Sequence, residues 1–110
     1  IAVDSYEIPD RISARVKLKR TMCVFPHCTR TSARVDLDHI EEYVPPDQGG
    51  PPGQTATDTL APLCRRHHRA KTHPSPEGRW DYQQLTPTTW LWTSPHGIRF
   101  LVHPDGTTEL

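Results

Sequence analysis

The three cysteines and one histidine of this chain are spaced like the ligands of a tetrahedral metal ion. Cys23 and Cys28 bracket a short loop, and Cys64 lies one helical turn before His67. Zinc favours such close pairs, because both ligand atoms of a pair must reach one ion at about 2.0–2.3 Å. The sequence therefore predicts a structural Zn²⁺ ion bound by Cys23, Cys28, Cys64 and His67.

Two other interpretations of the cysteines stay open. A disulfide would leave one of the 3 cysteines unpaired, and nothing in the sequence marks the chain as secreted. Free thiols are also common in protein interiors. Among the histidines, His67 completes the ligand set better than His27, which lies inside the first loop, or His68.

A second group of side chains could form another centre beside the zinc site. Asp38 and His39 end a predicted strand, just before a loop rich in glycine and proline, and His68 follows the zinc ligand His67. Neighbouring residues of a helix point about 100° apart. If the strand end faces the helix, Asp38 and His68 could hold a hard divalent cation. His39 would then lie beside that ion as a base, whereas an isolated Asp-His dipeptide would simply be an exposed strand end.

The elements that must position these residues are short. Ile12 and Val16 repeat at helical spacing after Pro9, and Pro62 forbids a regular helix around it. Alternating apolar and polar residues predict one half-buried strand before the glycine- and proline-rich loop. The predicted elements are a helix over 9–19, a strand over 34–40, a loop over 43–54, an extended or irregular segment over 55–63 and a helix over 64–72.

The C-terminal third of the chain reads as a small antiparallel sheet. Three β-prone stretches, 80–85, 89–93 and 98–103, are separated by Pro87 and by a turn over 94–97. Trp90 and Trp92 fall on one face of the middle stretch. These tryptophans could stack on nucleic-acid bases, but tryptophans on a strand more often belong to the core. We therefore expect a three-stranded meander with both rings buried.

The composition predicts one small domain with a thin core. The chain has 110 residues, of which 34% are apolar, with 12 prolines and 6 glycines. Small domains of this kind usually need a metal, a disulfide or a partner for stability. No long apolar run predicts a membrane helix or a signal peptide, and we expect a cytoplasmic location. The chain begins at Ile1 rather than Met, so we expect it to be part of a longer protein.

The charges cancel overall but are segregated along the chain. Lys and Arg total 13, as do Asp and Glu. Segment 11–34 contains basic residues and no acid, 35–64 contains acids and no Lys or Arg, and 65–71 is again basic. These blocks could be no more than solvated faces. Nucleic-acid backbones respond to local patches rather than to net charge, however, so the order of the charges favours DNA as a partner.

Taken together, four motifs make most of the chain, about 11–93, resemble an HNH endonuclease domain. They are Cys23-x4-Cys28, Leu37-Asp38-His39-Ile40, Gly49-Gly50, and the run from Leu60 to Thr72 with Cys64-Arg-Arg-His67-His68 at its centre. Similar domains are found at the C-terminal end of many actinobacterial proteins. The resemblance implies an α+β fold with a ββα-metal core on a treble-clef zinc knuckle. We expect an arm and basic helix over 1–20, the core over 21–75, and the meander over 76–110 in the same domain.

The same resemblance assigns roles to individual residues. It implies that His39 is the general base for hydrolysis of a DNA phosphodiester bond. Asp38 and His68 would hold the catalytic Mg²⁺, Mn²⁺ or Ni²⁺, and the Cys3His set would hold zinc. The basic side chains would contact phosphates and add affinity without sequence choice. The residues expected to do so are Arg20, Arg30, Arg34, Arg65, Arg66, Arg69 and Lys71.

One position departs from the family pattern. The asparagine of the family name usually precedes the leucine that aligns with Leu60, and this chain has Thr59 there. The family's asparagine helps to fix the loop that presents the base, and threonine has a shorter reach for the same hydrogen bonds. Two alternatives to an active nuclease therefore stay open. The domain could be a zinc-stabilised DNA-binding module without catalysis or a zinc-stapled protein-interaction domain, either as a monomer or as a homodimer.

Overall fold

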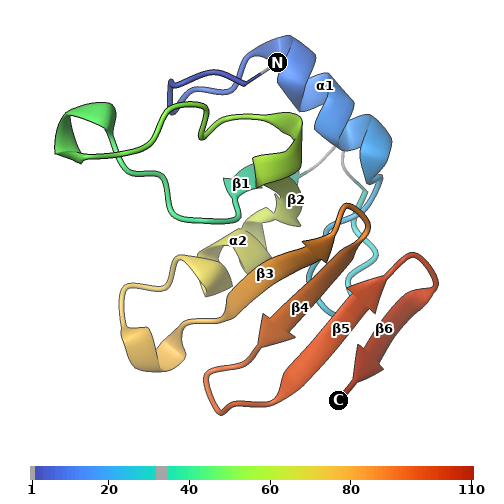
Figure 1. The fold of residues 1–110 in the computed structure, drawn as a ribbon. Helices are drawn as coiled ribbons and strands as arrows, with labels where there is room; N and C mark the ends of the chain where they lie inside the picture. The colour runs from blue at the N-terminus through green and yellow to red at the C-terminus, as the bar shows by residue number, and fades with distance from the viewer. Residues whose placement is uncertain (1, 32–34) are drawn as a thin grey trace.

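A computed structural model describes residues 2–31 and 35–110. Arg34, one of the expected DNA contacts, lies outside the described residues. The described part is α+β, with α-helices α1 (Asp10–Lys19) and α2 (Arg65–Lys71) and two antiparallel sheets (Figure 1). Neither helix is long and apolar enough to cross a membrane.

The first sheet is a pair of strands that leads into α2. β1 (Val35–His39) pairs with β2 (Leu60–Cys64), with Val35 opposite Cys64 and His39 opposite Leu60. The strand predicted over 34–40 and the helix predicted over 64–72 are therefore confirmed within one residue at each end. Pro62 lies inside β2, where a missing N–H is tolerated because, in the part of the chain that the structure describes, no third strand pairs with β2.

The second sheet has one more strand than the sequence predicted. Its strands run in the order β3 (Asp81–Thr86), β4 (Thr89–Thr93), β5 (Arg99–His103) and β6 (Gly106–Glu109). The expectation of a three-stranded meander was wrong about β6. This strand is short and polar, and it follows β5 through a tight turn, so the alternation of apolar residues gave no sign of it.

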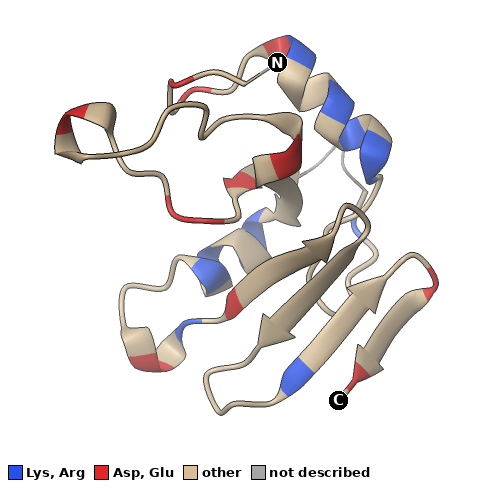
Figure 2. Cartoon of the chain, viewed as in Figure 1, with Lys and Arg blue, Asp and Glu red and all other residues tan. Residues whose placement is uncertain are grey.

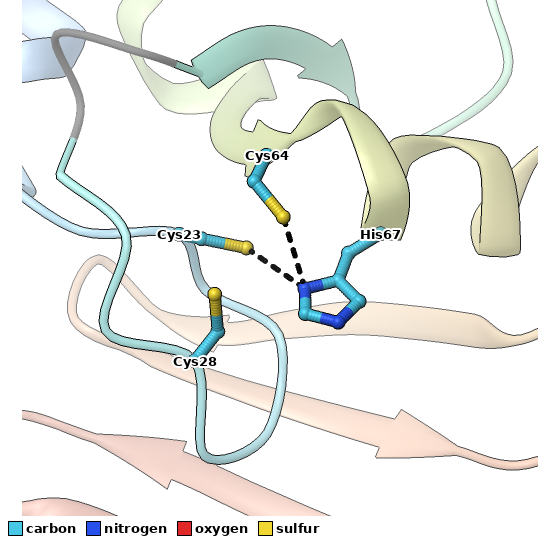
Figure 3. Close-up of side chains that lie close together, drawn as sticks. All are labelled: Cys23, Cys28, Cys64 and His67. Atoms are coloured by element: carbon cyan, nitrogen blue, oxygen red, sulfur yellow. Dashed lines mark hydrogen bonds between the residues drawn. The ribbon is translucent and has the colours of Figure 1, made fainter.

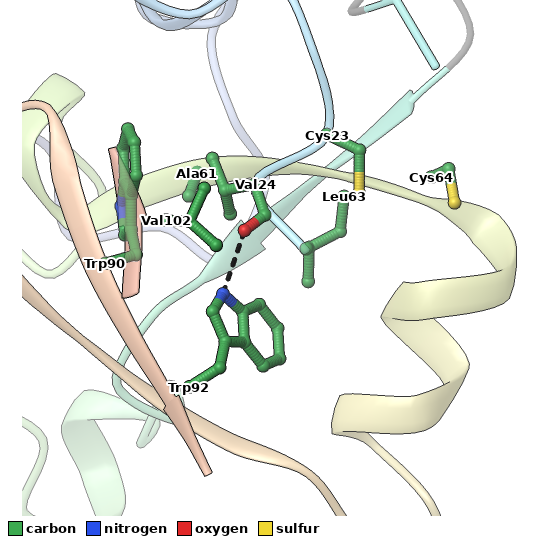
Figure 4. Packing of buried hydrophobic residues seen from close by; sticks show 8 residues of the cluster. All are labelled: Cys23, Val24, Ala61, Leu63, Cys64, Trp90, Trp92 and Val102. Atoms are coloured by element: carbon green, nitrogen blue, oxygen red, sulfur yellow. Dashed lines mark hydrogen bonds between the residues drawn. The ribbon is translucent and has the colours of Figure 1, made fainter. Parts of the chain in front are cut away.

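The main core lies between the two sheets. Trp90 and Trp92 are 3% and 0% exposed, so their expected place in the core is confirmed (Figure 4). The indole Nε1 of Trp92 donates to the carbonyl of Val24 at 2.9 Å, which ties β4 to the loop that carries the first cysteine pair. A smaller cluster joins Ile12 and Val16 of α1 to Leu60.

Short 3-10 helices lie in the described connections: η2 (Pro46–Gln48), η3 (Thr57–Thr59) and η4 (Pro76–Gly78). The segment predicted to be extended or irregular over 55–63 contains η3 and most of β2. The N-terminal arm pairs with this region through a bridge between Val3 and Thr55. The arm is thereby placed over the connection from β1 to β2 (Figure 1).

Candidate metal centre and histidine pocket

The first cysteine pair lies in a closed loop next to the second pair. Met22 pairs with Thr31, and the N–H of Cys23 donates to the carbonyl of Arg30 at 2.9 Å. These contacts close the loop that carries Cys23 and Cys28. On the other side, β2 ends at Cys64 and the first turn of α2 carries His67.

All four predicted ligands converge (Figure 3). Their ligand atoms lie within 4.8 Å of one another. The Nδ1 of His67 is 3.2 Å from the sulfur of Cys64 and 3.6 Å from that of Cys23. A tetrahedral ion with Zn–S bonds of about 2.3 Å would hold its ligand atoms about 3.5–3.8 Å apart. The spacing and the soft sulfur donors therefore fit a metal ion such as zinc.

Burial makes an ionised thiol at this cluster unfavourable unless a cation lies beside it. It raises the pKa of the Cys23 thiol to about 12, because a thiolate is poorly solvated there. His67 has a lowered pKa, first because of burial and then because of the charges of Arg66 and Arg30, so its imidazole is held in the neutral form that ligates metals. The ring of Phe25 stacks on His67 at 3.9 Å between centroids and fixes its orientation. His27 is exposed and lies outside the cluster.

A second cluster lies at the next residue of α2, where β1 presents two carboxylates to the imidazole of His68. Asp36 and Asp38 are two residues apart on a strand, so their side chains share a face. The Nδ1 of His68 is 3.4 Å from Asp36, and its Nε2 is 3.2 Å from Asp38. The hydrogen bond with Asp38 is the main cause of a raised pKa at His68.

Asp38 is buried and fully surrounded by donors. Its side chain is 4% exposed. Lys71 Nζ lies 3.0 Å from one carboxylate oxygen and donates to the carbonyl of His39 at 2.7 Å. The hydroxyl of Tyr82 donates to Asp38 at 2.7 Å. A buried carboxylate needs such partners. Lys71, which the sequence placed among the phosphate contacts, is thus bonded to Asp38.

His39 is held on two sides. It is 8% exposed, and burial is the main cause of its lowered pKa. Its Nε2 lies 2.8 Å from the hydroxyl of Thr55. The ring of Tyr6, from the N-terminal arm, stacks on the imidazole at 5.4 Å between centroids, and Tyr43 packs against both rings.

Three of the four residues predicted to be catalytic, namely Asp38, His39 and His68 but not Thr59, share one pocket. A cavity of about 220 Å³ is lined by Asp38, His39 and His68, together with Lys71 and the aromatic rings of Tyr6 and Tyr43. The strand end and the helix therefore meet as the sequence pattern requires. A carboxylate and two imidazoles around one opening are groups that can bind a cation or a phosphate and exchange protons.

Thr59 lies outside this pocket. Its hydroxyl donates to the carbonyl of Gln54 at 2.7 Å and accepts from the N–H of Ala56, while its carbonyl accepts from the N–H of Ile40. Thr59 therefore ties the connection to the end of β1, next to His39. It is Thr55, which the sequence pattern did not single out, that contacts the imidazole itself.

Four other residues of the site were also missed. Asp36 could have been found, because it precedes Asp38 by two positions and must share its face. Tyr82 contacts Asp38 across the interface between the sheets. Tyr6 and Tyr43 lie in segments without periodicity, so no local signal connects them with His39.

The basic residues expected to contact phosphates differ in their exposure and in the partners they already have. Arg30, Arg66 and Arg69 are exposed. Arg65 is also exposed, 3.7 Å from Asp36. Arg20 is partly buried, donates to the carbonyl of Met22 and lies over the ring of Trp90. Basic residues mark α1 and α2, whereas acids gather on the N-terminal arm and on the connection between β1 and β2 (Figure 2).

Comparison with known proteins finds relatives whose function is not described. The uncharacterized protein Rv3776 of Mycobacterium tuberculosis is 32% identical over 100 residues, covering 91% of this chain and 17% of that protein. The uncharacterized protein Rv2100 of the same organism is 29% identical over 99 residues, covering 90% of this chain and 16% of that protein. The chain thus spans about a sixth of the length of these relatives. No protein-family model matches it, and no solved structure matches it significantly.

Proposed function

We propose that this domain is a metal-dependent DNA endonuclease of the HNH type, with a ββα-metal core formed by β1, β2 and α2. The observation that supports this most directly is the meeting of Asp38, His39 and His68 at one pocket beside a Cys3His cluster. The cluster would hold structural zinc, which would join the cysteine loop to the start of α2.

A divalent cation in the pocket would be held by Asp38 and His68. One carboxylate and one imidazole are a small donor set, but Mg²⁺ commonly keeps only one or two protein ligands and takes the rest from phosphate and water. The cation would neutralise charge that develops on the phosphate and on the leaving oxygen. For it to bind, Lys71 must give up at least one oxygen of Asp38.

The remaining chemistry belongs to side chains of this chain. His39 is neutral because burial lowers its pKa, so it can accept a proton from a water molecule. That water oxygen attacks the phosphorus, and the bond from phosphorus to the leaving sugar oxygen breaks. Lys71, once displaced from Asp38, stays next to the pocket and can bind a phosphate oxygen.

One observation favours a second candidate, a DNA-binding module without catalysis. Lys71, His68 and Tyr82 already satisfy Asp38, so the carboxylate does not require a metal ion for its burial. In that case the exposed arginines would bind DNA, and the histidine pocket would serve only stability.

Supercoiled plasmid distinguishes the two candidates. We expect the domain to nick it in Mg²⁺, Mn²⁺ or Ni²⁺ and not after these ions are removed, with zinc content measured in parallel to show that the Cys3His site stays loaded. The variant Asp38→Asn should bind plasmid but not nick it. Plasmid binding without nicking by wild type in any of these metals would support the binding module, and no binding at low salt would exclude both candidates.

A further inference from the structure

Thr55 joins the N-terminal arm to His39 through a single hydroxyl group. Thr55 is 0% exposed. Its hydroxyl oxygen lies 2.5 Å from the carbonyl of Ser5 and 2.8 Å from Nε2 of His39. Both contacts are within hydrogen-bond distance, so each must have one donor and one acceptor.

The number of hydrogens decides which atom donates. A hydroxyl has one hydrogen, and a backbone carbonyl can only accept. The Thr55 hydroxyl must therefore donate to Ser5. Its oxygen can then only accept from His39, so Nε2 carries a hydrogen. In a neutral imidazole the other nitrogen, Nδ1, is left with the lone pair.

Nδ1 is the ring nitrogen of His39 that is left open to solvent. Within the described residues, no buried side-chain nitrogen or oxygen lacks a hydrogen-bond partner, and Nδ1 of His39 has no such partner. It is therefore in contact with solvent, and His39 lines the pocket. The lone pair is available where a water molecule or a substrate would lie.

The arm that supplies the Ser5 carbonyl is firmly attached. Val3 and Thr55 exchange two backbone hydrogen bonds, of 2.8 and 3.1 Å. The carboxylate of Asp4 accepts from the N–H of Gly53, and its carbonyl accepts from the hydroxyl of Tyr43, both at 2.6 Å. Tyr6, two residues after Asp4 in the same arm, stacks on the ring of His39.

We propose that Thr55, oriented by the Ser5 carbonyl, is a positioning residue that holds His39 in the tautomer with hydrogen on Nε2 and presents Nδ1 to the pocket. The tautomer is independent of any activity, whereas its role in hydrolysis rests on the proposed function. The arm is then part of the site, because without the Ser5 carbonyl the hydroxyl could instead turn its hydrogen toward the imidazole.

The tautomer can be read directly by nitrogen NMR of the folded domain at about pH 8, where an imidazole is neutral. Couplings from the ring carbons to the two nitrogens distinguish the protonated one, and His39→Ala assigns the signal. We expect hydrogen on Nε2 in wild type and in Thr55→Ser, and a mixture of both tautomers in Thr55→Val. Thr59→Val is the matched control, since its hydroxyl lies in the same connection but does not contact His39.

Cleavage rates then test whether the positioning of His39 by Thr55 contributes to hydrolysis. We expect Thr55→Val to lower kcat by about 10-fold or more with little change in KM, since general-base catalysis contributes about 10²- to 10⁴-fold. Thr55→Ser should restore most of the rate. Hydrogen on Nδ1 in wild type would overturn the proposal even if Thr55→Val fails to fold, and so would a Thr55→Val protein that keeps both tautomer and rate. The expected tautomer in a wild type that does not cut DNA would instead contradict the proposed function.

Discussion

At the scale of one residue, His68 lies in an ion pair with two carboxylates at the position where we propose a metal ligand. Each ring nitrogen faces a different carboxylate, from Asp36 and Asp38. With no divalent cation bound, a protonated His68 can donate to both carboxylates. If a cation bound at Asp38 as proposed, His68 would have to be neutral to donate a lone pair, so protons and metal would compete for the same group.

The ion pair between His68 and the two carboxylates predicts a pH dependence of stability. The pKa of His68 is raised in the folded domain, chiefly by its hydrogen bond with Asp38. A raised pKa means that His68 stabilises the fold fully below its unfolded pKa of about 6.5, and that this contribution disappears as the pH rises through the folded pKa. Without added Mg²⁺, we expect the gap in free energy of unfolding between wild type and His68→Asn to be larger at acid than at alkaline pH. Urea titrations across this range measure the gap, and an equal gap at every pH would contradict the ion pair.

At the scale of elements, the Cys3His cluster joins a loop and a helix that lie far apart in the sequence. It links a closed loop to the start of a helix of 7 residues, which is too short to be stable alone. A structural zinc ion can contribute about 10–16 kcal/mol of apparent binding free energy at neutral pH. Such a contribution would suit a chain with so few apolar residues.

Replacing one cluster ligand should therefore release the metal and unfold the domain. We expect one tightly bound zinc per wild-type chain by elemental analysis, and little or none in Cys64→Ser. The matched control is His27→Gly, because His27 lies in the same loop but outside the cluster and has a φ of 61° that glycine adopts without strain. His27→Gly should keep its zinc and fold normally. A folded, zinc-free Cys64→Ser protein would rule out a stabilising metal.

The elements nearest the cysteines and histidines could be predicted from sequence, and those held by distant contacts could not. Spacing alone located the four clustered ligands, and alternation located β1, since both signals are local. The contact between Thr55 and His39 depends on the arm, whose residues show no periodicity. The sequence pattern pointed to Thr59 for positioning the base, but the hydroxyl that contacts His39 belongs to Thr55. The place of a residue in an irregular loop is set by tertiary hydrogen bonds, which leave no local sequence signal.

At the scale of the whole molecule, the formal net charge is zero, but basic and acidic residues lie on different surfaces. Exposed arginines lie on α2 and near the cysteine loop, while acids line the connection between β1 and β2. Phosphates would be attracted to the first surface and repelled from the second. The DNA backbone would then approach the pocket from the α2 side.

This division predicts which arginines govern DNA affinity. Removing Arg66 and Arg69 together, as glutamines, should weaken binding to all sequences alike. It should also lower the slope of log affinity against log salt by about 0.9 for each phosphate that the variant no longer neutralises. Fluorescence anisotropy at several salt concentrations measures both. Arg15 on α1 and Arg99 on β5 are exposed arginines outside α2, and their double glutamine variant serves as the control. Equal weakening in the two double variants would argue against a DNA surface on α2.

Plasmid nicking by His39→Ala tests most directly whether His39 is the base of a nuclease centre, as we propose. Loss of a general base should lower the rate by about 10²- to 10⁴-fold. The exposed His96, which lies far along the chain in the turn between β4 and β5, supplies the matched variant His96→Ala. With equal zinc content and equal DNA binding in all three proteins, we expect nicking by wild type and His96→Ala and almost none by His39→Ala. Nicking by His39→Ala at the wild-type rate would contradict the account.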